Sequence, residues 1–291
     1  MKTKLFLLMA LVLCLMTGFA LAEATYTEEV ISIPNGDHEI PATVVLPANA
    51  ENVPAVVMLH GTGSNREEAG NGYQMAAPVL AEKYGIATIR IDFMGNGDSK
   101  ADYTGYTFDS AVSDAVAAAK YMAALPQVKD DAIGVMGWSQ GGTDALLAAG
   151  RHPEAFKAVV TWAGAPDLSN MLTPELEADA EKNGYFVMTF DWRDALHVSK
   201  QWVDDVKNTD VLSVFSAFEG PVLAIHGEQD TTVDPAWSDK IVAASKNPAS
   251  AKHMIAGMDH TFNVFSEGDA GYPALYNAVD ATGAFFAEQL K

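Results

Sequence analysis

Cysteine is almost absent from this 291-residue chain. The single cysteine, Cys14, lies in an apolar run near the N-terminus, and the preceding Leu11-Val12-Leu13 lacks the small residue expected ahead of a lipid-modified cysteine. Without that run the chain has no disulfide, no thiol nucleophile and no thiolate metal ligand. In a chain that is exported, as predicted below, the lack of cysteine indicates a bacterial secreted or surface protein.

Basic side chains are also scarce. Lys and Arg number 18 against 38 Asp and Glu, which gives a formal net charge of −20. Such a surface repels nucleic acids and anionic membranes, and it favours solubility and neutral or apolar substrates. We therefore predict no nucleic-acid partner.

Residues 1–22 have the features of a secretory signal peptide. Lys2 and Lys4 precede the apolar run Leu5–Met16, and Ala20-Leu21-Ala22 forms an A-x-A cleavage site. An uncleaved membrane anchor is the alternative, because this apolar stretch could nearly span a bilayer. We predict cleavage near Ala22, a secreted or extracytoplasmic location, and no stable membrane association after cleavage.

Short apolar runs alternate with helical patterns along the rest of the chain. Runs such as Ala55–Leu59 are apolar throughout, which is typical of strands buried on both faces. The alternation predicts an α/β fold with a mostly parallel eight-stranded sheet and helices on both faces. The predicted strands are 28–33, 38–46, 55–59, 86–91, 133–136, 158–163, 221–225 and 251–255. The predicted helices are 66–83, 108–124, 142–149, 235–245 and 272–289.

The alternation is interrupted between Pro166 and Glu219. This stretch carries many aromatic and methionine side chains among acidic residues. We interpret 166–219 as a cap inserted over the site, with 23–165 and 220–291 forming the core domain. A few helices of the main sheet are the alternative interpretation.

The pentapeptide Gly137-Trp138-Ser139-Gln140-Gly141 has the pattern G-x-S-x-G. It follows a predicted strand and precedes a predicted helix, which is the order of a nucleophile elbow. The turn is so tight that the positions two before and two after the serine must lack side chains. We predict Ser139 as a nucleophile above the N-terminus of a helix, where developing negative charge is favoured.

A serine nucleophile needs a base, and the base works best when a carboxylate orients it. Asp230 lies in the loop after the strand at 221–225, and His260 follows the last short strand. Ser139, Asp230 and His260 thus occur in the chain order of α/β-hydrolases. Asp234 and Asp259 are the alternatives for the carboxylate.

An oxyanion hole requires two hydrogen-bond donors near the nucleophile. We predict the backbone N–H of Gln140 as one and that of Thr62, in the loop after the strand at 55–59, as the other. Gly61 and Gly63, which flank Thr62, are alternatives to it.

Other polar motifs have structural interpretations. The turn Gly95-Asn96-Gly97 lacks the third glycine and the helix of a dinucleotide-binding loop, so we interpret it as a structural turn beside the site. His60 and His226 each end a strand, and we interpret them as loop supports. The sequence has no metal-spaced cluster and no phosphate-binding loop, so we predict neither a cofactor nor a metal ion.

Together these motifs resemble the α/β-hydrolase superfamily, and most of all its bacterial feruloyl and cinnamoyl esterases. The resemblance covers nearly the whole chain after the leader, with two departures, Asn96 and Trp138, where those enzymes often carry histidine. The motifs that carry it are His60-Gly61 with Ser64-Asn65, Asp92-Phe93 with Gly95 to Ser99, Gly137 to Gly142, His226-Gly227 with Asp230 and Val233, and Gly257 with His260.

The resemblance implies a serine carboxylesterase that cleaves aromatic carboxylic esters beneath a cap, and the leader predicts that it is secreted. Its expected partner is a small-molecule ester, of the kind derived from plant cell walls, and no oligomeric state is predicted. A serine peptidase of the aminopeptidase or oligopeptidase type and an acyltransferase are the alternative enzymes. A non-catalytic binding protein is the alternative outside enzymes.

Overall fold

The computed structural model describes residues 25–266 and 272–291. The predicted leader at 1–22, with Cys14, lies outside the described residues. Within the described part of the chain, no helix is both long and apolar enough to cross a membrane.

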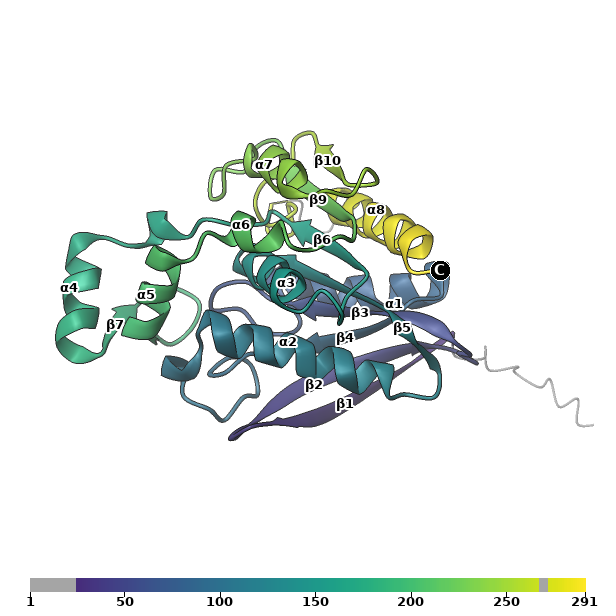
Figure 1. The fold of residues 1–291 in the computed structure, drawn as a ribbon, viewed down its shortest axis with the longest axis horizontal. Helices are drawn as coiled ribbons and strands as arrows, with labels where there is room; N and C mark the ends of the chain where they lie inside the picture. The colour runs from purple at the N-terminus through teal and green to yellow at the C-terminus, as the bar shows by residue number, and fades with distance from the viewer. Residues whose placement is uncertain (1–24, 267–271) are drawn as a thin grey trace, which may run out of the picture.

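Eight strands form one sheet in the order β1-β2-β4-β3-β5-β6-β9-β10 (Figure 1). β1 pairs antiparallel with β2, and β2 antiparallel with β4, whereas every other neighbouring pair is parallel. The prediction of a mostly parallel eight-stranded sheet is confirmed. The strands are β1 (Tyr26–Asn35), β2 (His38–Pro47), β3 (Val53–Leu59), β4 (Ala87–Ile91), β5 (Val128–Trp138), β6 (Ala158–Trp162), β9 (Val222–Gly227) and β10 (Ala251–Ile255).

Helices cover both faces of the sheet, and each face has its own apolar core. Along β3, Val57 and Leu59 belong to one core while Val56 and Met58 belong to the other. Side chains alternate between the two faces of a strand, so burial on both faces explains the unbroken apolar run. The first core packs against α2 (Phe108–Ala123), α3 (Gln140–Arg151) and α7 (Trp237–Ala244), and the second against α1 (Gly72–Tyr84) and α8 (Pro273–Gln289).

The helix predicted over 66–83 begins at Gly72 instead. Glu68, Gly70 and Asn71 have φ angles of 64°, 56° and 61°, in a left-handed region that an α-helix cannot contain. A short 3₁₀ turn, η1 (Ala69–Asn71), occupies this place. The irregular backbone brings Glu68 beneath the loop that follows β3, which matters for the site.

Between β6 and β9 the chain leaves the sheet. Figure 1 shows α4, β7 and α5 projecting from the left side of the sheet. β7 and β8 form an antiparallel hairpin. The elements of this segment are η3 (Ser169–Met171), α4 (Pro174–Asn183), β7 (Tyr185–Met188), β8 (Leu196–Ser199), α5 (Lys200–Asn208) and α6 (Val211–Phe215). They lie within the residues predicted as a cap, and we call 166–219 the cap segment.

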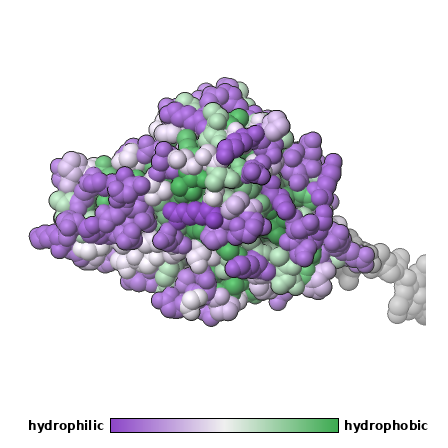
Figure 2. Space-filling view, viewed as in Figure 1, coloured by the Kyte–Doolittle hydropathy of each residue, from purple (hydrophilic) through white to green (hydrophobic). Residues whose placement is uncertain are grey.

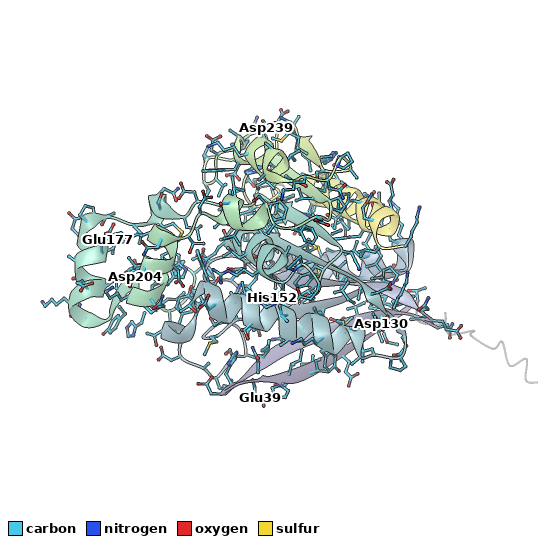
Figure 3. All side chains as sticks on the ribbon, in the orientation of Figure 1. Glu39, Asp130, His152, Glu177, Asp204 and Asp239 are labelled. Atoms are coloured by element: carbon cyan, nitrogen blue, oxygen red, sulfur yellow. The ribbon has the colours of Figure 1, made fainter. Side chains whose placement is uncertain are left out.

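The cap segment presents a hydrophilic exterior. Purple, hydrophilic residues cover most of the projecting end in Figure 2. The labelled acids Glu177 and Asp204 lie on α4 and α5 in Figure 3. Exposed acidic residues of α4, namely Glu175, Asp179 and Glu181, contribute to this hydrophilic surface.

Candidate active site

Ser139 lies between the end of β5 and the start of α3, with φ 55° and ψ −119°. This strained backbone is tolerated because its neighbours leave room. A Cβ atom at Gly137 would lie 1.8 Å from the carbonyl oxygen of Gly141, and one at Gly141 would lie 2.2 Å from that of Leu59. Glycine is therefore required at both positions, as the elbow pattern predicts.

The structure brings Ser139, His260 and Asp230 into one line of hydrogen bonds. The distance from Ser139 Oγ to His260 Nε2 is 3.0 Å, and that from His260 Nδ1 to Asp230 Oδ2 is 2.8 Å. Asp230 follows β9 and His260 follows β10, so both lie at the carboxyl ends of neighbouring parallel strands. This is the nucleophile, base and carboxylate geometry of a hydrolytic triad.

Asp230 is held as a carboxylate. Its Oδ1 accepts the backbone N–H groups of Thr232 and Val233 at 2.8 and 2.9 Å. Burial would raise the pKa of Asp230, but hydrogen bonds from His226, His260 and the Val233 backbone outweigh it and keep that pKa well below its usual range. Asp230 is thus suited to accept the Nδ1–H of His260.

His226 supports the same carboxylate, which sequence reasoning missed beyond its role as a loop support. Its Nε2 lies 3.0 Å from Asp230 Oδ2 and 3.1 Å from the carbonyl oxygen of Val233. Both partners are acceptors, so Nε2 carries the proton, and Nδ1 accepts from the Ser238 hydroxyl at 3.1 Å. The spacing His-Gly-x-x-Asp was the available signal.

The alternative carboxylates bond within their own loops. Asp234 accepts the backbone N–H of Ala236, and Asp259 accepts those of Thr261 and Asn263. Both make local turn contacts of the usual aspartate kind. Asp230 is the one that bonds His260.

Trp138 anchors the loop that carries His260. Its indole Nε1–H donates to the carbonyl oxygen of His260 at 3.0 Å. Its ring meets that of Phe262 edge-on, with centroids 4.8 Å apart. Trp138 therefore connects the elbow to the loop of His260.

The loop after β3 lies against the elbow. The N–H of Gly61 donates to Glu68, so it is not free to bind an oxyanion. The Thr62 hydroxyl donates to the side-chain oxygen of Gln140 at 2.5 Å, which joins the two residues predicted to line the oxyanion hole. Gln140 is the first residue of α3, so the helix itself offers its N–H no acceptor.

Glu68 was not singled out from the sequence, because the stretch around it was predicted as helix. Its carboxylate accepts the Gly61 N–H, the Ser64 hydroxyl at 2.7 Å and the Ala69 N–H at 2.6 Å. These three bonds hold the turn of the loop after β3.

A pocket of about 570 Å³ opens at Ser139 and His260. Trp192 of the cap segment and Phe265 of the His260 loop both line it, with 64% and 71% of their surfaces exposed. Large exposed aromatic side chains at a pocket are typical of a binding surface for apolar groups.

The turn at Gly95-Asn96-Gly97 is structural. A Cβ atom at Gly97 would lie 2.2 Å from Asp92, whose carboxylate bonds Arg66 and the Asp98 N–H. His60 links this turn to the loop after β3, since its Nε2 accepts the Phe93 N–H at 3.2 Å. Across the described ranges, no three His, Cys, Asp or Glu residues gather as a metal site.

Comparisons with known proteins agree on the superfamily. The model of the prolyl oligopeptidase family matches residues 71–276. The 2,6-dihydropseudooxynicotine hydrolase of Paenarthrobacter nicotinovorans is 32% identical over 216 residues, which are 69% of this chain and 52% of that protein. This chain thus spans about half the length of that relative.

Solved structures share the fold at lower identity. Est1E from Butyrivibrio proteoclasticus, with ferulic acid bound, is similar at a TM-score of 0.70 and 23% identity, covering 89% of this chain and 98% of that one. Dienelactone hydrolase from Anabaena variabilis is similar at a TM-score of 0.65 and 21% identity, covering 92% and 100%. At these identities the similarity shows the α/β-hydrolase fold.

Proposed function

We propose that this chain, which belongs to the prolyl oligopeptidase family and has the α/β-hydrolase fold, acts as a serine carboxylesterase. The observation that carries the proposal is the continuous hydrogen bonding from Ser139 through His260 to Asp230 at the mouth of a pocket. Such an arrangement raises the nucleophilicity of a hydroxyl.

In the proposed reaction, Ser139 Oγ attacks the ester carbonyl carbon while His260 Nε2 takes the hydroxyl proton. Asp230 stabilises the resulting imidazolium through its bond to Nδ1. The backbone N–H groups of Thr62 and Gln140 bind the oxyanion of the tetrahedral intermediate. The intermediate expels the alcohol, which receives the proton from His260. A water molecule, activated by the same base, then releases the acid from Ser139.

The pocket favours an ester with an apolar, aromatic acyl group. Trp192 and Phe265 offer ring surfaces beside the nucleophile. The pocket carboxylate, Glu68, already accepts three hydrogen bonds, whereas an aminopeptidase needs a carboxylate to bind the substrate's ammonium group. Hydroxycinnamoyl (feruloyl) esters of plant cell-wall origin fit this description. Ferulic acid is bound in the similar structure of Est1E, which supports the proposal.

Peptide hydrolysis is the second candidate, because the family model is that of prolyl oligopeptidases. Acyl transfer to an alcohol would use the same acyl-enzyme. Export through the leader at 1–22 is part of the proposal and rests on the sequence pattern.

A hydrolysis screen tests the proposal. Purified protein and a Ser139→Ala control are given p-nitrophenyl acetate, longer acyl esters, methyl ferulate and an aminoacyl anilide. We expect turnover of methyl ferulate that Ser139→Ala abolishes. Turnover of short esters alone would contradict the aromatic substrate class, and cleavage of the anilide alone would contradict the esterase.

A further inference from the structure

A chain of side-chain hydrogen bonds runs from the site into the core. The Thr62 hydroxyl donates to Gln140 Oε1 at 2.5 Å, Gln140 Nε2 donates to the Tyr106 hydroxyl at 2.8 Å, and that hydroxyl donates to Asp144 Oδ2 at 2.6 Å. Every donor points toward Asp144. The chain thus connects the loop after β3, the residue following the nucleophile, the segment before α2 and the interior of α3.

Asp144 is an unusual residue for its place. It lies on the elbow helix, is fully buried, and its Oδ1 has no hydrogen-bond partner among the described residues. A buried carboxyl group with one hydrogen bond is costly, and an apolar side chain would be more stable there. A carboxyl group at the end of this hydrogen-bonded chain therefore points to a role beyond stability.

The pocket end of this hydrogen-bonded chain indicates what that role is. Thr62 and Gln140 carry the two backbone N–H groups that the proposed function assigns to the oxyanion hole, and their side chains bond each other directly. The distance between these donors decides how well both meet one oxygen atom, and small displacements weaken such stabilisation strongly. Tyr106 and Asp144, the other two members of the hydrogen-bonded chain, hold the side-chain amide of Gln140 in one orientation.

We propose that Tyr106 and Asp144 are positioning residues that set the oxyanion hole, acting through the side chains of Gln140 and Thr62. This inference rests on the proposed function. The oxyanion exists in the transition state and not in the bound substrate, so a loosened hole lowers kcat and leaves KM nearly unchanged.

Two variants break the chain at different links. Tyr106→Phe removes the central hydroxyl, and Thr62→Val removes the hydroxyl at the pocket end while keeping the backbone N–H. We expect each to lower kcat for the best ester of the screen roughly 10-fold, with KM changed less than about 2-fold. Because both act on one chain, the double variant is expected to lose little more than either single variant.

Tyr103→Phe is the matched control. The Tyr103 ring stacks on that of Tyr106, with centroids 5.4 Å apart, and its hydroxyl is not part of the chain. Removing it is expected to leave kcat and KM near those of the wild type. Thermal unfolding of every variant identifies any that fails to fold. If Tyr106→Phe fails to fold, Thr62→Val provides the test, because its hydroxyl lies at the partly buried end of the hydrogen-bonded chain.

The outcomes separate the two proposals. A wild type that turns over the ester, with unchanged kcat in folded Thr62→Val, would overturn the positioning role alone. Fully additive losses, or losses in KM instead of kcat, would overturn it too. A wild type that hydrolyses no ester would contradict the proposed function and, with it, this role.

Discussion

His226 and Asp230 lie four residues apart, yet both act on the same histidine. His226 donates to the carboxylate that accepts from His260, and Ser238 in turn holds the ring of His226. The proposed base is therefore oriented through two layers of hydrogen bonds. At the scale of single residues, the carboxylate depends on a side chain that is fully buried and does not line the pocket.

Replacing His226 with leucine removes one donor from Asp230. We expect kcat for ester hydrolysis to fall roughly 10-fold, because a less restrained carboxylate orients His260 poorly. Gln at this position can still donate, so His226→Gln is expected to recover part of the activity. His253→Leu, at a half-buried histidine of β10 that bonds Asn277, is the control. Equal activity in His226→Leu and the control would contradict this account of His226.

The raised pKa of Asp144 makes the free energy of unfolding depend on pH. Burial and the charge of Asp114 raise its pKa from 3.8 to about 7, against the opposing effects of the Tyr106 hydrogen bond and Arg151. The native state thus keeps a proton that the unfolded chain releases from about pH 4 upward. The carboxyl group's contribution to the free energy of unfolding is full below that pH and is lost as pH rises to about 7.

Asp144→Asn cannot ionise and should lack this decline. Urea unfolding below about pH 4 and above about pH 7 measures this decline. Between the two, the wild type is expected to lose on the order of 4 kcal/mol more free energy of unfolding than the variant. Asp230 has the opposite sign, because its lowered pKa makes its contribution disappear at acid pH. Parallel pH dependence in the wild type and Asp144→Asn would contradict the raised pKa of Asp144.

At the scale of elements, the cap segment is tied to the loop after β3. Between β7 and β8, the Arg193 guanidinium donates to the carbonyl oxygens of Gly63 and Gly95 and to Asn96 Oδ1. The ring of Phe190 fills the space that a side chain at Gly63 would occupy. Asn96 is therefore an acceptor for a residue of the cap segment.

Arg193→Met should loosen this contact. We expect faster hydrogen exchange in residues 189–195, and a KM for ester substrates raised about 3-fold, because Trp192 beside it lines the pocket. Lys207→Met is the matched control, since Lys207 pairs with Glu177 inside the cap segment. Unchanged exchange in Arg193→Met would show that the guanidinium does not hold the segment.

The elements that the sequence predicted well are those with strong local patterns. Apolar runs such as Val56–Leu59 located the strands, because burial on both faces leaves no polar position. The start of α1 was misplaced, since nothing in residues 66–71 marks a glutamate at positive φ. The hairpin of the cap segment was missed because β7 and β8 have only four residues each, which is too short for a clear alternating pattern.

At the scale of the whole molecule, the sheet explains how distant residues meet. Ser139, Asp230 and His260 were predictable because each follows a strand whose carboxyl end lies at the same edge. Glu68 was not, because the stretch around it was predicted as helix although its contacts are to nearby residues. Tyr106 and Asp144 were not, because their contacts arise from packing between elements far apart in the sequence. Tertiary contacts of this kind leave no local pattern.

Labelling with a fluorophosphonate tests the central claim, an activated nucleophile at Ser139, most directly. We expect one phosphonyl group per chain, located by peptide mass spectrometry on Ser139, with labelling slowed strongly in His260→Ala. A folded wild type that takes up no label, or takes it up at another residue, would contradict the assignment of Ser139 as nucleophile.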